Sequence, residues 1–534
     1  MRFIQSKIIG LFLIMSPLHV SAQTHHSART VVGDTSISNF SQSRVNIHTQ
    51  KFMFLGKGMI VERTDKNLPI WFHITADQIT GQREGKSGGS SWIEMKGELN
   101  FRVVQKLNAV TRTVEGSAQS AVYNQKKSLL TISGQVSATL RATSYQKSIV
   151  HIHGDQADIT MNAPHSILLS GIAGHTEIYL TYFQSSINGK VSSGPITITG
   201  FRDAALEPGS SLLIEGPGTT AHLTDIATHL DAIVVTEKIQ AGYGQTMKNL
   251  VFSGGVQLDA VQKDATGKQL QALHSRSETL TYSQAQGSLK MAGRVHALYE
   301  DSERLDGPAK IQVQQATLFL NGDHSIRLSG ESETDRIDFS PRLLSTVKKS
   351  ANSNGKYNSG HMDITQFNAL NYLPGKKLIV FGKNLTIQSS NPASGTATLL
   401  MCSQLTVTFL QNGGIDSLNA QGPVTYHFKA PESPGGSQPA GSETIDGSTS
   451  SLHFQNGKNS PVVSLNGPTK MLISNSGDNQ RMRYQDAAGD QVRWNLSSDE
   501  VSSTSPLRTA TLQMLLPDTG KKNAPAVQTR KKSK

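Results

Sequence analysis

The sequence predicts an all-β protein of tandem antiparallel coiled-sheet repeats, with a period of about 37–45 residues. Apolar and polar residues alternate at every second position from about residue 50 to residue 500, whereas helical periodicity is rare. Charged residues make up 17% of the chain, which is low for a coiled coil or a typical helical protein. At 534 residues the chain also exceeds one compact domain, so a repeat array is expected.

The N-terminus has the features of a cleavable secretory signal. Arg2 and Lys7 provide a basic start, residues 8–15 are an apolar run, and Val20-Ser21-Ala22 provides small residues for cleavage after position 22. A transmembrane anchor is the alternative, but eight apolar residues fall short of the roughly 20 that span a bilayer. We therefore expect an exported protein with a signal peptide over 1–22.

A glycine recurs on the apolar face of the alternating stretches. The clearest copies centre on Gly97, Gly134, Gly254, Gly293, Gly330, Gly422 and Gly467, and weaker copies on Gly171, Gly216 and Gly382. In chain order these glycines are 37, 37, 45, 38, 39, 37, 52, 40 and 45 residues apart. Glycine within a strand marks a bulge, bend or close backbone approach, so each strand is expected to bend there as the sheet coils into a roll. At about ten residues per strand and turn, one step would hold three or four strands.

Composition divides the chain into five segments. After the signal peptide 1–22, an N-terminal β-repeat region spans 23–347 and a C-terminal one spans 361–516. Between them, 348–360 begins Lys-Lys-Ser-Ala-Asn-Ser-Asn-Gly and is predicted to be a linker. Residues 517–534 are predicted to be a disordered basic tail.

The positive charge is concentrated at the C-terminus. The formal net charge is +11, and the tail contributes +5 of it through six Lys and Arg residues offset by Asp518. The folded body is therefore only mildly basic. Nucleic-acid binding would require basic residues on one folded face with aromatic residues among them, so no nucleic-acid partner is expected.

Catalytic motifs are missing from the sequence. The single cysteine, Cys402, excludes a disulfide framework and multi-cysteine metal sites, and its place in an alternating strand predicts a small buried hydrophobe. There is no Gly-x-Ser-x-Gly nucleophile elbow. The triplet Gly85-Lys86-Ser87 resembles a phosphate-binding loop, but Thr80 stands where that loop requires glycine.

Two groups of potential ligands share a strand face: His151, His153 and Asp155, and Glu331, Glu333 and Asp335. The first could form part of a zinc site, and the second a calcium site or the carboxylates of a glycosidase. Spacing fixes no third ligand for the first group, and a solvated outer face or protection of a sheet edge explains the second group better. We expect no catalytic residues, no metal and no cofactor.

Three stretches carry a family resemblance: Tyr123 to Leu140, Tyr282 to Tyr299, and Leu405 to Phe428. Each has an aromatic residue or strand, a turn, and an alternating strand containing Gly-x-Val. This pattern resembles the OstA-like (LptA-type) β-jelly-roll repeat of lipopolysaccharide transport, and the resemblance covers about residues 50–475. It implies a non-enzymatic protein of the periplasm, free or associated with the inner or outer membrane, that binds lipopolysaccharide or a related glycolipid.

The resemblance implies a hydrophobic groove, because each methylene of an acyl chain exposed to water costs about 0.8 kcal/mol. The inward candidates are Leu130, Ile132, Val136, Phe252, Val256, Leu258, Leu289, Met291, Val295, Val424, Tyr426 and Phe428. A closed, packed core is the alternative for the same residues. Open sheet edges would pair with other lipopolysaccharide-transport β-jelly-roll proteins by edge-strand addition.

Two other functions remain open at this stage. A structural or adhesive exported β-repeat protein without lipid cargo would suit the low charge and the Ser/Thr/Gly-rich turns. A polysaccharide-active enzyme would require two carboxylates that converge in a cleft.

Overall fold

The structure is a computed structural model of the chain. It describes residues 28–63, 69–83, 92–107, 110–142, 150–163, 165–172, 174–180, 185–187, 190–192, 195–206, 211–225, 229–242, 249–283, 286–302, 305–319, 325–330, 334–340, 360–391, 395–410, 415–431, 442–456, 461–475, 481–495, 500–503 and 509–515. The predicted signal peptide, the predicted tail and all of the predicted linker except Gly360 lie outside these residues.

The described residues form β-strands and turns, which confirms the all-β prediction. Thirty-one strands belong to one antiparallel sheet, and β12 (Ser185–Ile187) and β13 (Lys190–Ser192) form a separate hairpin. In this part of the chain no helix is long and apolar enough to cross a membrane.

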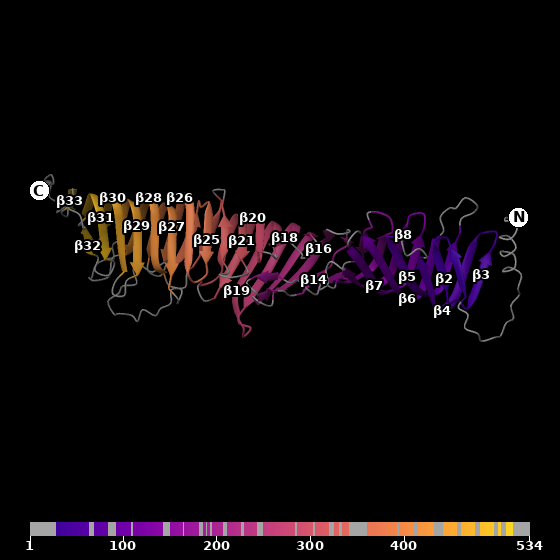
Figure 1. The fold of residues 1–534 in the computed structure, drawn as a ribbon. Helices are drawn as coiled ribbons and strands as arrows, with labels where there is room; N and C mark the ends of the chain where they lie inside the picture. The colour runs from indigo at the N-terminus through magenta and orange to yellow at the C-terminus, as the bar shows by residue number, and fades with distance from the viewer. Residues whose placement is uncertain are drawn as a thin grey trace.

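The large sheet contains three successive units of the same design (Figure 1). The first comprises β2 (Thr35–Ser38), β3 (Gln42–Asn46), β4 (Lys51–Arg63), β5 (Ile70–Gln82), β6 (Trp92–Leu107), β7 (Val110–Asn124), β8 (Leu129–Ala142), β9 (Val150–Thr160), β10 (Ile167–Ser170) and β11 (Glu177–Leu180). The second comprises β14 (Ile196–Thr199), β15 (Asp203–Leu206), β16 (Ser211–Asp225), β17 (Leu230–Gly242), β18 (Asn249–Lys263), β19 (Gln269–Ser283), β20 (Ser288–Asp301), β21 (Ala309–Phe319), β22 (Ile326–Ser329) and β23 (Arg336–Phe339). The third comprises β24 (His361–Thr365), β25 (Ala369–Leu373), β26 (Lys377–Asn391), β27 (Thr396–Phe409), β28 (Ile415–Pro431), β29 (Ser442–Asn456), β30 (Pro461–Asn475), β31 (Arg481–Asn495), β32 (Glu500–Ser503) and β33 (Thr509–Leu515). β1 (Arg29–Val32) forms a hairpin with β2.

Each unit has six long strands between two pairs of short strands. A short pair takes the place of one long strand: one half of β9 pairs with β10, and its other half pairs with β11. The units join through the same device, since β10 and β11 pair with β15 and β14, and β22 and β23 pair with β25 and β24. The sheet is therefore continuous across the predicted linker, although the linker itself lies outside the described residues. Together the units form one elongated molecule with its strands across the long axis (Figure 1).

Eight of the ten predicted glycines lie at register shifts inside long strands, whereas Gly171 and Gly330 follow the short strands β10 and β22. Around Gly254, for example, the register of β18 shifts between Ser253 and Val256, and the glycine has a φ of +87°. Gly134 and Gly293 likewise have positive φ, a conformation that favours glycine. The bend is thus confirmed at these eight glycines, but a step inside a unit holds two long strands of 11 to 17 residues rather than three or four short ones.

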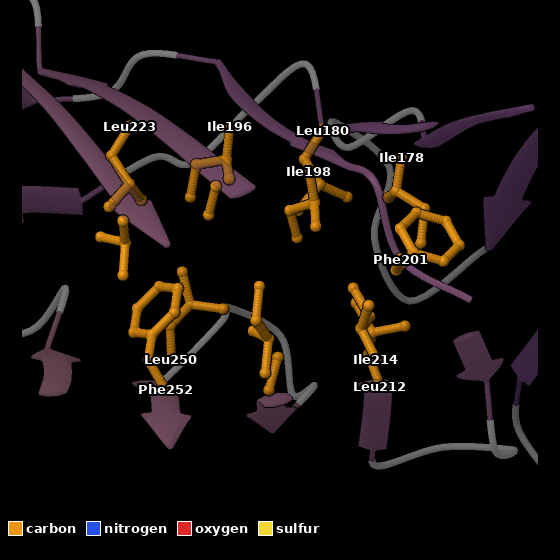
Figure 2. Close-up of a cluster of buried hydrophobic side chains, with 14 of the residues drawn as sticks. Ile178, Leu180, Ile196, Ile198, Phe201, Leu212, Ile214, Leu223, Leu250 and Phe252 are labelled. Carbon is orange, nitrogen blue, oxygen red and sulfur yellow. The ribbon is translucent and has the colours of Figure 1, made fainter. Parts of the chain in front are cut away.

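The bends divide the sheet into two facing walls. Each long strand contributes one half to each wall. Wall 1 consists of the halves that are hydrogen-bonded in series with the short strands β3, β10, β15, β22, β25 and β32. Wall 2 consists of the other halves, in series with β2, β11, β14, β23, β24 and β33. Figure 2 shows the result for β16, whose two ends carry Leu212 and Leu223 on opposite walls. Alternation then directs every second side chain of both walls into the space between them.

The interior is apolar along most of the molecule. One cluster of buried hydrophobic side chains extends from Val32 to Val424 through all three units. A smaller cluster, which includes Ile445 and Trp494, lies in the last strands and shares Tyr426 with the first. In Figure 2, inward side chains of β11 and β14 face those of β16 and β18 across the interior.

Each unit begins with the same kind of corner, which lies between its first two short strands. Its tripeptides are Asn39-Phe40-Ser41, Gly200-Phe201-Arg202 and Gln366-Phe367-Asn368. The first residue of each has a φ between +58° and +73°, and the third donates its N–H to the carbonyl of Leu55, Glu215 or Phe381. The three phenylalanines are 161 and 166 residues apart and pack against the core. A longer period of one roll per 160 or so residues is therefore superimposed on the glycine period.

Candidate functional site

The structure places all twelve predicted groove residues on inward faces. Leu130, Ile132, Val136, Phe252, Val256, Leu258, Leu289, Met291, Val295 and Val424 are at most 2% exposed, and Tyr426 and Phe428 are half-buried. They come from β8, β18, β20 and β28, so they lie in three different rolls and share one interior without forming one compact site. At most of these positions side chains of the protein itself fill the space between the walls.

An apolar cavity of ≈ 70 Å³ lies where the second and third units join. Its lining is drawn from both walls: Tyr299, Leu305, Ala309, Ile311, Ile326, Leu328, Ile337, Phe339, Leu370, Tyr372, Leu378 and Phe409. One water needs roughly 10–15 Å³ on this measure and two or more polar partners. The cavity is several times larger than that and offers almost no polar surface, so it suits hydrocarbon better than water.

Aromatic side chains line the outer side of this cavity. At the corners the two walls are joined by the bent strands, and on the opposite side their free outer ends face each other. We call this second side the mouth of a roll. Tyr299 on wall 2 packs against Tyr372 on wall 1 in a T-shaped pair with centroids 6.3 Å apart, and Tyr372 packs against Phe409 at the same distance. Phe339, Tyr372 and Phe409 are only partly buried. The cavity therefore lies at a mouth that is bordered by apolar rings.

Cationic side chains lie on wall 1 beside this mouth. Phe409 donates its N–H to the carbonyl of Lys376, which is exposed, and Lys377 begins β26 next to it. On the outer face of β22 the guanidinium of Arg327 lies 4.7 Å from the ring centroid of Phe319. An amphiphile with its chain in the cavity would thus find positive groups near its head, and such groups form the stronger hydrogen bonds with phosphate or carboxylate.

The sequence does not reveal this cavity. Tyr299, Ile326 and Leu328 lie in copies of the repeat, but nothing in the alternation distinguishes them from packed residues. Phe339 and Tyr372 belong to short strands of four and five residues that show little periodicity. Their proximity depends on which strands of one wall lie over which strands of the other.

The suggested zinc ligands do not assemble. His151 and His153 lie on the outer face of β9, whereas Asp155 accepts a hydrogen bond from the N–H of Ile172 at 2.8 Å and contacts His175 at 3.2 Å. The backbone N–H of Ile172 keeps the pKa of Asp155 below its ordinary value. Within the described part of the chain no three His, Cys, Asp or Glu residues are grouped as a metal site would need.

The remaining chemical candidates that the structure describes, Asp335 and Cys402, are buried. Glu331 and Glu333 lie outside the described residues, and Asp335 is buried at the corner that follows Gly330. Cys402 is buried as predicted, and burial raises its pKa to about 11, which keeps the thiol protonated and unreactive.

An antiparallel sheet of bent strands, folded into two walls around an apolar interior, defines the protein as a tandem coiled β-jelly roll. Residues 72–165 match the family model of the LptA/(LptD N-terminal domain) LPS transport protein. This match covers most of the first unit, from Phe72 in β5 to His165 after β9, and confirms the resemblance to the LptA-type lipopolysaccharide-transport family. No curated protein matches the chain.

Proposed function

We propose that the protein is a non-enzymatic periplasmic carrier of lipopolysaccharide or a related glycolipid. It shields acyl chains between its two walls during transfer to the outer membrane. The observation that carries this proposal is the single apolar interior that extends through all three rolls and widens into a cavity at the aromatic mouth. The family match over residues 72–165 supports lipopolysaccharide as the cargo class.

The physical basis is the cost of exposing several acyl chains to water, about 0.8 kcal/mol for each methylene. Inward side chains that contact one another can exchange these contacts for contacts with the hydrocarbon of the cargo, and no apolar surface becomes exposed to water. Aliphatic side chains and Met291 accommodate chains of different shape more readily than a rigid polar site would. The saccharide of the cargo would stay outside, close to Lys376, Lys377 and Arg327.

The three rolls give the carrier its length. Each roll occupies about eight strand positions, and strands are spaced by about 4.8 Å, so the interior would extend over roughly 110 Å. A single chain can therefore stand in for several copies of a shorter bridge protein joined end to end.

The N-terminal end offers an edge for assembly. In the described part of the chain β3 pairs only with β4, and all five of its residues are exposed. Val31, Val45 and Ile47 are each more than half exposed at this end. Unpaired backbone groups beside exposed apolar side chains favour strand addition, so we propose another β-jelly-roll protein of lipopolysaccharide transport as the partner.

The first test is detergent-free purification from an envelope fraction, followed by native mass measurement. The proposal expects glycolipid to remain bound. A photo-crosslinking residue at Leu328, which lines the cavity, should then label the glycolipid, whereas the same residue at Gln312, on the outer face of β21, should not. A lipid-free protein with no labelling at Leu328 would instead favour the structural or adhesive alternative.

A further inference from the structure

The mouth of the first roll is crossed by a network of polar side chains centred on Asp34. Asp34 lies at the tip of the β1–β2 hairpin, on wall 2. Its carboxylate accepts hydrogen bonds from Arg63 Nε at 3.1 Å, Tyr123 Oη at 3.0 Å and Gln125 Nε2 at 2.7 Å. Gln125 also donates to the carbonyl of Val32 at 3.1 Å. With Thr35 Oγ1, which donates to Asp34 Oδ1 at 3.0 Å, the carboxylate receives four donors, three of them from two distant parts of the chain.

These donors come from both walls. Arg63 ends β4 on wall 2, whereas Tyr123 ends β7 on wall 1 and Gln125 is in the turn that follows. The contact between the walls continues inward, because Tyr123 packs edge-on against Phe72 of wall 2 with centroids 5.0 Å apart. The hydrogen bonds of Tyr123 and Gln125 therefore tie the wall 2 hairpin to the wall 1 edge, above an aromatic pair, while the Arg63–Asp34 ion pair joins two parts of wall 2.

A second polar contact crosses the same mouth further along the roll. Gln105 near the end of β6 on wall 2 is fully buried and donates its Nε2 to the carbonyl of His165, just before β10 on wall 1, at 3.3 Å. At the mouth, therefore, a strand of wall 2 faces a later strand of wall 1: the β1–β2 hairpin faces β7, and β6 faces the start of β10. The twist of the strands produces this offset. The mouth of the first roll is held by polar groups at two places along its length.

The contrast with the cavity mouth is chemical. There, Tyr299 and Tyr372 meet edge to face beside an apolar lining, and a polar contact lies within wall 2, where the Tyr299 hydroxyl donates to buried Asp301 at 3.5 Å. In the first roll a carboxylate and its donors occupy the equivalent seam. Water can replace every hydrogen bond of the network when it opens, so each bond contributes only about 0.5–1.5 kcal/mol net. The apolar contacts at the corner, by contrast, cannot be replaced by contacts with water. A polar seam over an apolar hinge is the arrangement expected of a closure that opens and shuts.

We propose that Asp34, Arg63, Tyr123 and Gln125 form a clasp that closes the first roll sideways, and that an acyl chain enters this roll through its mouth only when the clasp opens. The inference rests on the proposed function and adds a control point to it. Burial and the charge of Asp34 raise the pKa of Tyr123, so its phenol stays protonated and remains a donor. The clasp is therefore insensitive to moderately alkaline pH.

The test uses the full chain with a single background change, Trp494→Phe. The sequence has three tryptophans, so Trp71 and Trp92, both in the first unit, then become the only energy donors. The probe is 11-dansylaminoundecanoic acid, mixed rapidly with the protein while tryptophan-to-dansyl energy transfer is recorded. This signal reports arrival of the chain in the first roll and separates its rate from its final amplitude.

Tyr123→Phe removes one hydroxyl and keeps the ring against Phe72. We expect it to raise the association rate at least threefold, and Asp34→Asn about tenfold, with the final amplitude unchanged. Tyr179→Phe is the matched control, because it removes a hydroxyl from the outer face of β11 in the same unit, and its rate should equal the parent's. Circular dichroism and the melting temperature establish that each variant is folded.

A locked form tests the opposite direction. Asp34→Cys and Gln125→Cys, made with Cys402→Ala and joined by a bis-maleimide with a reducible spacer, should slow association at least tenfold, and reduction should restore it. Unchanged rates in the open variants and in the locked form, with normal amplitude, would reject the clasp and leave the proposed function standing. No energy transfer in any of the proteins would reject acyl binding in the first roll and the clasp together.

Discussion

Filling the apolar cavity should weaken cargo binding by an amount that the structure allows us to calculate. Ala309, at the start of β21, lines the cavity and is 5% exposed. In Ala309→Phe the added ring would occupy the ≈ 70 Å³ of free space. Empty apolar cavities cost about 24 cal/mol per Å³, so cargo hydrocarbon that fills this one gains about 1.7 kcal/mol. Losing that gain would weaken the Kd roughly 15-fold.

The assay is glycolipid titration with a photo-crosslinking residue at Leu370, which also lines the cavity. The half-saturating concentration should rise roughly 15-fold in Ala309→Phe. Lys310→Phe is the matched control, because it adds the same ring at the next position on the exposed outer face and should leave binding unchanged. Overpacking of a well-filled site costs about 1–3 kcal/mol of stability, so a melting curve should accompany each titration. A folded Ala309→Phe protein with the parent's half-saturating concentration would refute a cavity role in cargo binding.

Four further predictions concern the interior and the bends. Val295→Asp places an unpaired charge at a fully buried position and should abolish crosslinking of lipopolysaccharide while distant rolls stay folded; its cost of about 3–5 kcal/mol is measured by urea unfolding. Gly293→Val should lower the free energy of unfolding by about 1–3 kcal/mol, because a β-branched residue is strained at a φ of +78°. Cys402, with a pKa of about 11, should react with iodoacetamide at pH 8 only after unfolding, since roughly one thiol in a thousand is ionised. Asp155 has a lowered pKa in the folded protein, so its carboxylate stabilises the fold above its unfolded pKa, and this stabilisation is lost as the pH falls through the lower folded pKa. Asp155→Asn should therefore flatten the acid limb of a plot of stability against pH.

Each of these predictions has a clear contrary result. Wild-type crosslinking in a folded Val295→Asp protein would count against an apolar path through the second roll. Equal stability of Gly293→Val and the parent would mean that the bend of β20 does not depend on its glycine. Rapid alkylation of native Cys402 would show that β27 opens locally. An unaltered acid limb in Asp155→Asn would assign that acid sensitivity to other carboxylates.

The local features of the fold follow from the sequence. Alternation through Phe252, Gly254, Val256 and Leu258 predicts a strand, its inward face and its bend, and all three are present in β18. These properties can be predicted because the pleat makes side-chain direction a matter of adjacent residues, and because positive φ is a local preference of glycine. The inward placement of all twelve groove candidates follows from the same rule. The division at 348–360 remains a prediction.

The arrangement between walls could not be predicted in this way. The sequence contains the three corner phenylalanines, but it does not show that each begins a roll until the short strands beside it are seen to replace one long strand. The strand lengths were also underestimated, because about ten residues per strand and turn is typical of straight strands, whereas these strands continue through their bends.

Alternation and glycine placement therefore predict an all-β chain, the faces of its strands and most of its bends, and the repeat motif predicts the family resemblance. The pairing of the strands and the packing of the walls establish the three rolls, the contact of Tyr299 with Tyr372 at a cavity, and the hydrogen bond that Tyr123 donates to Asp34, 89 residues away. The physical reason is the twist of the strands. It sets how one wall crosses the other, and it accumulates over many strand pairs, so no local pattern specifies which edges finally meet.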